Sequence, residues 1–520
     1  MAQSRPLTTL QQQLKSARAY NKAIKQRNAT GDLIYVPGTG KVISSAYEQL
    51  RNAAEYNEGR IVLERAIKRF YRRMLFVVKR HPEGIGQELI TELVLGGYLL
   101  DNECSTVTAD SISQLAVEYM AIYARLRQAH NPQRKAQDWV LAILSVRTED
   151  LLRPYAHYLA LVDFTYQQFL RQLPKGRLLQ NAEPDTDYEL SLYVAIHQAL
   201  LKSDIDVVRA DILRLSGQTA DTISTYAALN RHVDTIYTAG FTLRLRRLVS
   251  KNGAPYRILK SLIDDVPTLL ELLPDREAFL QAYDVQIKTE YARIARRLNK
   301  GLIKSVIFLF ITKGIIGMGI EVPFDLIVYG SVVVIPFTVN LLFPPLYIAA
   351  LRLGVRMPTN SDAQMTRHFM DRLLYGDGDP KLTVRERTRP YSFPVKVISS
   401  VFFLAPFVVT YLLLRTLHFN PLQMGIFFVF FSTASFLGFV LRGMVRELRM
   451  DKSHMSILSV LLDFFYLPFI LFGRWLAGKY ARINFVGVFL DTVIELPLKT
   501  LLHVMRQWVR FVTEKYEEIY

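Results

Sequence analysis

What the chain lacks narrows the classes of protein it can belong to. Its 520 residues include a single cysteine, Cys104, so an internal disulfide and a cysteine-based zinc site are both excluded. Its nine histidines are scattered and none belongs to an HExxH motif, the pattern of zinc proteases. No GxSxG occurs, which removes the nucleophile elbow of serine hydrolases. We therefore predict no catalytic residue, no metal site and no cofactor, and an enzyme is the least favoured class.

A phosphate-binding loop is missing as well. The pair Gly40–Lys41 has the dipeptide that ends such a loop. The motif also needs a glycine five residues before its second glycine, and Ser or Thr directly after the lysine. Here those positions hold Tyr35 and Val42, so the hydroxyl that would bind magnesium is absent. The segment is predicted to be a turn before a helix.

The charge balance indicates an anionic partner. The chain has 64 Lys and Arg against 47 Asp and Glu, a net charge of +17. Such an excess is typical of proteins that contact nucleic acid or the anionic inner face of a membrane. The long apolar runs described below favour the membrane, and no nucleic-acid partner is favoured. The first residues lack the apolar core of a signal peptide, so we expect the part before residue 300 not to be exported by a cleaved signal.

The pattern of residues changes near residue 300. Residues 1–42 form a polar, basic arm followed by a Gly/Pro turn. From residue 43 to 300, apolar residues recur at steps of three and four with charges between them, which predicts a soluble helical domain. Alternating strand patterns are scarce and no fixed repeat is evident. The predicted fold class is all-α, with a large soluble helical domain before a bundle of transmembrane helices.

After residue 300 the chain contains apolar runs long enough to cross a membrane, which takes about 20 residues. We predict a first transmembrane hairpin at 301–353, a cytoplasmic basic loop with a short helix at 354–396, and a second hairpin at 397–452. The acidic segment Glu321–Asp325 is the predicted turn of the first hairpin. Residues 453–520 are assigned to re-entrant or interfacial helices and an amphipathic tail. This gives four spans, or six if Ser456–Gly473 and Ile483–Leu498 also cross.

Basic residues next to the apolar runs predict the orientation. Because Lys and Arg accumulate on the cytoplasmic side, both ends of each hairpin and the N-terminal domain are predicted to be cytoplasmic. The same residues are candidates for contact with anionic lipid headgroups: Arg296, Arg297, Lys300, Lys304, Arg442, Arg446, Arg449 and Lys452.

Polar residues within the apolar runs form the candidate site. Lys313 lies near the middle of the first predicted span and Asn340 near the middle of the second, so an antiparallel hairpin brings them to similar depth. The candidate acidic partners are Asp463, Asp491 and Glu495. Ionisable groups at membrane depth are costly and often functional, which favours a site for an ion, a proton or a headgroup. A structural ion pair that holds the bundle together is the alternative.

Three segments carry a resemblance to a known group. They are Ala46–Arg73, the first hairpin from ITKGIIGMGIEVPFDL to NLLFPPLYIA, and Gly473–Lys499. These are similar to segments of large uncharacterised membrane proteins from reduced-genome bacteria of candidate phyla. The resemblance implies a bacterial inner-membrane setting and carries no activity with it.

The sequence therefore predicts a multi-pass inner-membrane protein whose cytoplasmic helical domain acts as a tethered scaffold or assembly factor. It would bind a protein partner or associate with itself. The alternative is a transporter, channel or lipid-handling protein that uses Lys313, Asn340 and the late acidic residues. Few predicted spans and no evident inverted repeat weigh against the alternative.

Overall fold

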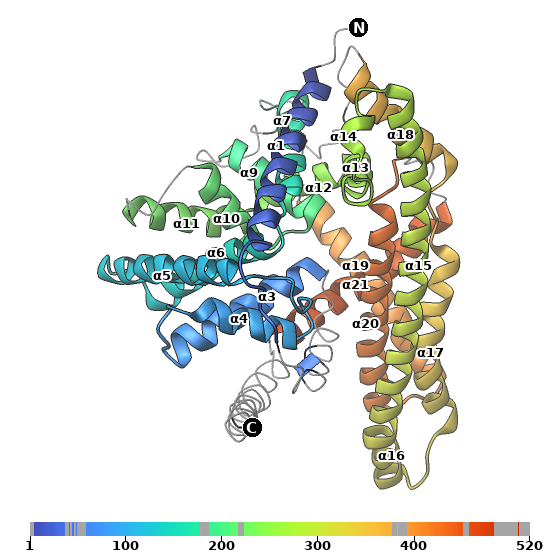
Figure 1. The fold of residues 1–520 in the computed structure, drawn as a ribbon. Helices are drawn as coiled ribbons and strands as arrows, with labels where there is room; N and C mark the ends of the chain where they lie inside the picture. The colour runs from blue at the N-terminus through green and yellow to red at the C-terminus, as the bar shows by residue number, and fades with distance from the viewer. Residues whose placement is uncertain are drawn as a thin grey trace, which may run out of the picture. The chain divides into compact units, whose positions relative to one another are not determined.

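The computed structural model describes residues 5–36, 59–173, 187–216, 223–376, 393–450 and 457–482, with a few single positions besides. In these ranges the regular structure is all helical and contains no strand, which confirms the predicted all-α class. The chain divides into two compact units, one of Met1–Ser250 with Val486–Tyr520 and one of Lys251–Phe485. Figure 1 shows the helices of each unit.

The first unit contains α-helices joined by short turns, and two of the helices continue into a π-helical turn. These elements are α1 (Arg5–Asn28), α3 (Gly59–Tyr71), η1 (Arg72–Val77), α4 (Ile85–Leu95), α5 (Thr106–Gln128), α6 (Gln133–Leu152), α7 (Ala156–Gln172), α9 (Tyr188–Ile196), η2 (His197–Leu201), α10 (Ile205–Leu215), α11 (Ile223–Thr238) and α12 (Gly240–Asn252).

Helix α6 is the centre of the first unit. Its residues from Trp139 to Val146 are all buried, as expected for a helix that is apolar on every side and enclosed by others. Helices α3, α5 and α10 pack against it. Next to it, α4 meets α5 at Gly86, where an added Cβ would lie 2.0 Å from the carbonyl oxygen of Ala109. The core of this unit is thus a layered helical packing around α6.

The predicted N-terminal arm is largely a helix that packs on the first unit. Helix α1 buries Leu7, Leu10 and Leu14 at three- and four-residue spacing and packs along α7. At its end, Asn28 donates to the carbonyl oxygen of Leu151 at 2.8 Å. Amphipathic spacing, rather than the polar composition of the segment, determines its structure.

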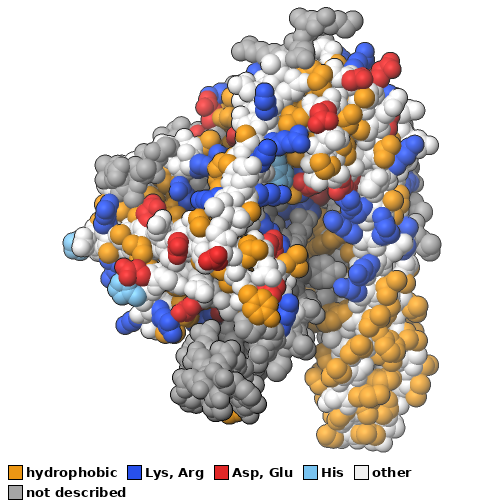
Figure 2. Space-filling model, viewed as in Figure 1, with side chains coloured by type: hydrophobic (Ala, Val, Ile, Leu, Met, Phe, Trp, Pro, Cys, Tyr) orange, Lys and Arg blue, Asp and Glu red, His pale blue; other side chains and the backbone are white. Residues whose placement is uncertain are grey.

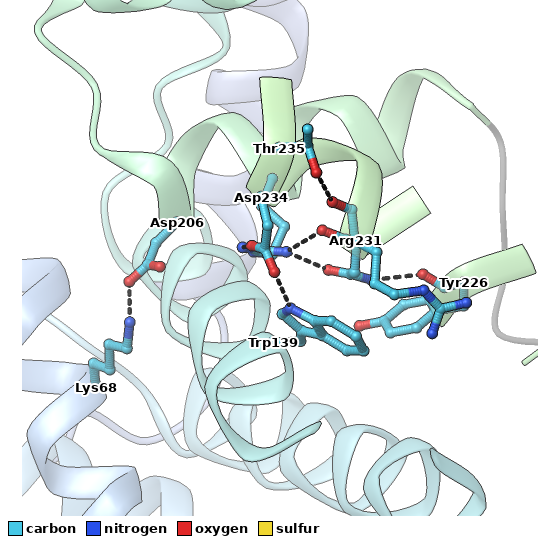
Figure 3. Close-up of polar contacts among 9 residues, drawn as sticks. Lys68, Trp139, Asp206, Tyr226, Arg231, Asp234 and Thr235 are labelled. Carbon is cyan, nitrogen blue, oxygen red and sulfur yellow. Dashed lines mark hydrogen bonds and ion pairs between the residues drawn. The ribbon is translucent and has the colours of Figure 1, made fainter. Parts of the chain in front are cut away.

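A buried polar network ties α6, α10 and α11 together (Figure 3). The Arg209 guanidinium, 4% exposed, donates to the backbone and side-chain oxygens of Asn230 and to one oxygen of Asp234. The second oxygen of Asp234 accepts from Trp139 Nε1 at 3.1 Å. A buried arginine is tolerated here because both terminal nitrogens of its guanidinium are paired in this way.

The second unit combines short helices with long apolar ones. Its helices are α13 (Ala254–Asp265), α14 (Leu269–Leu272), α15 (Arg276–Ile316), η3 (Gly317–Glu321), α16 (Val322–Tyr329), α17 (Val334–Gly354), α18 (Asn360–Tyr375), α19 (Phe393–Thr416), α20 (Pro421–Arg446) and α21 (Ile457–Arg482). The short helix predicted within residues 354–396 is present as α18, which begins with a capping box at Thr359.

Three helices of the described chain are long and apolar enough to cross a membrane: Arg276–Tyr329, Val334–Arg352 and Pro421–Arg446. A shorter apolar helix covers Phe403–Thr416. Large apolar side chains stand exposed along the first two, as Figure 2 shows for the lower end of this unit. They include Ile307, Phe308, Ile311, Ile315, Met318, Ile327, Val334 and Ile335. Such a surface is stable in lipid and unfavourable in water.

The first hairpin turns at a different place from the one predicted. Glu321–Asp325 is helical, and the chain turns instead at residues 330–333, where Gly330 has a φ of 73°. The prediction placed the two carboxylates in the turn of the hairpin. Both are fully buried with hydrogen-bond partners, so the helix continues through them.

The border between the two compact units falls at Ser250, whereas the hydropathy changes near residue 300. Helix α15 explains the difference, because its 41 residues carry a polar first half and an apolar second half. The polar half packs with α13 and α18, and Arg276 forms a two-point ion pair with Asp371 at 2.8 Å for both contacts. One helix therefore joins the polar and apolar parts of this unit.

Helix α21 runs without interruption from Ile457 to Arg482 and packs closely along α20. Gly473 makes this approach possible, since an added Cβ would lie 2.1 Å from the carbonyl oxygen of Ser432. From Ile457 on, the first of the two late apolar segments thus belongs to a longer helix that also carries Arg474 and Lys479. Ile483–Leu498 lies outside the described residues.

Candidate functional site

Six polar side chains meet inside the apolar part of the second unit, and we call them the charged cluster. They come from all three helices that are able to cross a membrane. The members are Lys313 (1% exposed), Glu321, Asp325, Asn340 and Gln423 (each 0%) and Asn420 (8%). Charged groups this deeply buried persist only when they are paired and hydrogen-bonded.

Lys313 and Glu321 form the ion pair at the centre of the charged cluster. They lie eight positions apart, a spacing that in a regular α-helix leaves the two side chains roughly 80° apart around the axis. The π-helical turn η3 ends at Glu321 and brings the two side chains to the same side of the helix. One inserted residue rotates the side chains that follow it back by roughly 100°. The lysine Nζ also lies 4.9 Å from the ring centre of Phe430, a favourable position for a cation.

Asn340 connects this ion pair to α20. Its amide nitrogen donates to the second carboxylate oxygen of Glu321 at 3.1 Å and lies 3.2 Å from the carbonyl oxygen of Gln423. Both contacts are with acceptors, so the nitrogen of the amide must face them. The amide oxygen of Asn340 has no hydrogen-bond partner among the described residues.

Asp325 of α16 contacts the N-terminus of α20, where a capping box orients two side-chain amides toward its carboxylate. The side-chain oxygens of Asn420 and Gln423 each accept from the other residue's backbone N–H, at 2.8 and 3.2 Å. Their amide nitrogens are left to donate to Asp325, at 2.8 and 2.9 Å. The positive end of the helix dipole adds a further favourable field for the carboxylate.

The charged cluster therefore fixes α15–α16, α17 and α20 in one arrangement. Chemically it pairs charges inside an apolar interior, and a change in any one of these charges would alter the pairing. Removing one partner of a buried ion pair typically costs about 3–5 kcal/mol, since the other charge is left uncompensated. The arrangement offers neither a nucleophile beside a base nor a set of metal-binding histidines or cysteines.

Of the five predicted intramembrane residues, the structure brings together Lys313 and Asn340, both on Glu321. Asp463 lies in α21, at a position whose side chain is outside the description. Asp491 and Glu495 lie outside the described residues. Sequence reasoning missed Glu321 and Asp325, which were assigned to a turn. The available signal was a pair of carboxylates inside a continuous apolar stretch, shortly after Lys313.

The predicted headgroup residues lie near one end of the apolar helices. Arg296, Arg297, Lys300 and Lys304 are exposed on α15, just before its apolar stretch, and Arg446 is exposed in the last turn of α20. We call these five residues the basic collar; Figure 2 shows Lys and Arg above the apolar surface of this unit. Arg442 is half-buried, Arg449 lies 3.9 Å from Asp362, and Lys452 lies outside the described residues.

The first unit has an acidic cluster of its own. Carboxylate oxygens of Glu64, Asp204 and Asp206 lie within 4.8 Å of one another. Burial, with repulsion from both aspartates, raises the pKa of Glu64 well above its ordinary value. Asp204 caps α10, Asp206 lies in its first turn and pairs with Lys68, so the helix N-terminus and one lysine account for both aspartates.

Over the described residues, the fold and the charged cluster define a class: an all-helical protein with three helices capable of crossing a membrane and paired charges buried between them. Comparisons with protein-family models, with curated proteins and with solved structures found no match to this chain. The functional argument therefore depends on the geometry of the chain itself.

Proposed function

We propose that this protein is a multi-pass protein of a bacterial inner membrane, whose helical first unit is a cytoplasmic module for binding a protein partner. The membrane part acts as its anchor. The observation that carries the proposal is the charged cluster, which locks the three span-capable helices together through side chains that are paired and buried. Such a lock suits a rigid tether for a scaffold or assembly factor.

Two further features support an anchor with a fixed orientation. The basic collar lies where α15 becomes apolar, as expected at a cytoplasmic membrane surface rich in anionic lipids. Four spans are proposed, with α19 as the fourth, because α19 extends over Phe393–Thr416 and ends in a turn that leads into α20. Partner binding or self-association then takes place on the cytoplasmic side.

The test is to purify the full-length protein from its native membranes in a mild detergent after cross-linking. We expect one protein, or a second copy of the chain, at a constant ratio to this protein. A matched preparation of the Lys313→Met variant shows whether that ratio depends on an intact charged cluster. A monomer that carries only lipid would contradict the scaffold role.

The charged cluster favours a second candidate function, transport of an ion or a lipid across the membrane. Its specific support is a lysine and two carboxylates at membrane depth, beside a π-helical interruption of a span. If Lys313→Met folds and keeps its partner but loses the cellular function of the protein, transport is favoured. If Lys313→Met folds and keeps both partner and function, the lysine is architectural and the scaffold role is favoured.

A further inference from the structure

The charges in the charged cluster do not balance. Glu321 and Asp325 supply two carboxylates, whereas Lys313 supplies one ammonium. All three are at most 1% exposed, so water screens them little. The N-terminus of α20 contributes about half a positive charge next to Asp325, which leaves part of one negative charge uncompensated.

We propose that the charged cluster binds one monovalent cation, either Na⁺ or a proton, beside Glu321, Asp325 and Asn340. The proposal goes beyond the tether and does not depend on it, because a bound cation is compatible with a rigid anchor and with a transporter. The cation would bring the buried charges to neutrality, the condition that a low-dielectric interior favours.

The hydrogen-bond donors around the carboxylates support an ionised cluster. The side-chain oxygens of Asn420 and Gln423 are held by the capping box, so only their NH₂ groups face Asp325. Glu321 likewise accepts from Lys313 with one oxygen and from Asn340 with the other. A carboxylate surrounded by donors is matched in its ionised form, which has no proton to give.

Oxygen acceptors remain in excess after these bonds are counted. An ionised carboxylate offers about four acceptor positions, and the bonds above use two on Glu321 and two on Asp325. The fully buried amide oxygen of Asn340 has no partner among the described residues. This oxygen belongs to the same amide group whose nitrogen donates to Glu321. Spare carboxylate and amide oxygens are the ligands that hard cations take.

The position of Asp325 indicates where the cation enters. Asp325 lies four residues before Tyr329, the end of α16, and its partner Asn420 immediately precedes α20. Tyr329 is 50% exposed and Asn420 is 8% exposed, so this side of the cluster is next to the two hairpin turns. Entry is thus from the end of the helices opposite the basic collar.

The experiment measures the melting temperature of the purified full-length protein in detergent at constant ionic strength, with NaCl replaced by choline chloride and with pH varied between 6 and 8. Asp325→Asn removes the excess charge. Asp284→Asn is the matched control, because Asp284 is a partly exposed carboxylate on α15 that pairs with Arg367. The assay contains no partner protein, so its failure is separable from failure of the scaffold role.

For Na⁺, we expect the melting temperature to rise by about 5 °C or more at saturation, in the wild type and in Asp284→Asn but not in Asp325→Asn. For a proton, the same two proteins gain stability as pH falls without Na⁺, and Asp325→Asn does not. Equal responses of all three proteins to both treatments would overturn the proposal.

Lys313→Met gives a second, independent readout. Removing the ammonium adds one negative charge to the uncompensated charge of the cluster, so the cation should bind more tightly. We expect the Na⁺ concentration, or the proton concentration, at the midpoint of stabilisation to fall at least tenfold. An unchanged or weaker dependence would contradict the proposal even if Asp325→Asn fails to fold.

Discussion

At the scale of single residues, this protein places charged groups in apolar surroundings and gives each a partner. Lys313 has Glu321, and Arg209 has Asn230 and Asp234. The sequence shows that charged residues interrupt apolar segments, but the spacing of residues along the chain does not identify the partner of each charge. Lys313 was found from the sequence because it interrupts an apolar run. Glu321 was missed because its acidic segment was taken as the turn of the hairpin, whereas the helix continues there through a π-helical turn.

Asp234 is predicted to stabilise the first unit through Arg209 and Trp139. Substituting Asp234 by Ala leaves the buried guanidinium short of one acceptor and frees the indole N–H, at a cost of about 2–3 kcal/mol. Thermal unfolding and the fluorescence of Trp139 would record the change. Thr235→Ala on the same helix removes an exposed hydroxyl bonded to the Arg231 backbone and should cost under about 0.5 kcal/mol. Equal losses in the two variants would refute the role of the network.

Glu64 is predicted to make the first unit less stable as pH rises. Its pKa in the folded protein lies well above the ordinary 4.5, owing first to burial and then to Asp204 and Asp206. The folded state therefore favours the neutral carboxyl, and that contribution is complete below pH 4.5 and lost as pH rises through the folded pKa. While Glu64 titrates, the loss is at most about 1.4 kcal/mol per pH unit.

The check is denaturation at several pH values from 5 to 8. Glu64→Gln stays neutral, so its stability should fall less with pH than that of the wild type. Substitution of the exposed Glu118 by Gln serves as the control and should follow the wild type. If Glu64→Gln and the wild type give parallel curves, the carboxyl is not held neutral by its burial.

At the scale of elements, close approach between helices is set by a few small residues. The structure places Leu351 of α17 where a side chain at Gly438 of α20 would lie. The sequence does not show the close contact at Gly473, because a glycine in an apolar run does not indicate which backbone packs against it. Helix identity was predictable from periodicity, while the bounds of α15 and α16 were not, because Gly317, Gly319 and Pro323 lie inside continuous helical structure and do not end it before Gly330.

Gly473→Ala is predicted to separate α20 from α21. The new methyl group would lie 2.1 Å from the carbonyl oxygen of Ser432, a backbone atom that cannot rotate away. Overpacking of this kind costs about 1–3 kcal/mol, seen as a lower melting temperature in detergent. Gly478→Ala in the same helix meets no atom within 4 Å and should be neutral or slightly stabilising, by up to about 1 kcal/mol. A Gly473→Ala protein as stable as Gly478→Ala would refute the close contact.

At the scale of the whole molecule, the sequence predicted the helical class and the apolar second part correctly. It placed the change of character near residue 300, whereas the compact units divide at Ser250, because periodicity does not show which neighbours a helix packs against. The orientation of the hairpins rests on the basic collar and remains a prediction of the positive-inside rule.

The central claim, a protein that crosses the membrane with its basic collar inside, is tested by cysteine labelling of intact cells with an impermeant maleimide. Cys104 is a suitable silent background, because it is buried, and burial raises its pKa to about 11. Ser331 lies in the turn between α16 and α17, Ser361 lies in the first turn of α18, and both positions are exposed. Each is substituted by Cys in a separate variant. We predict labelling of Ser331→Cys in intact cells and of Ser361→Cys only after permeabilisation. The reverse pattern, or equal labelling of both in intact cells, would contradict the account.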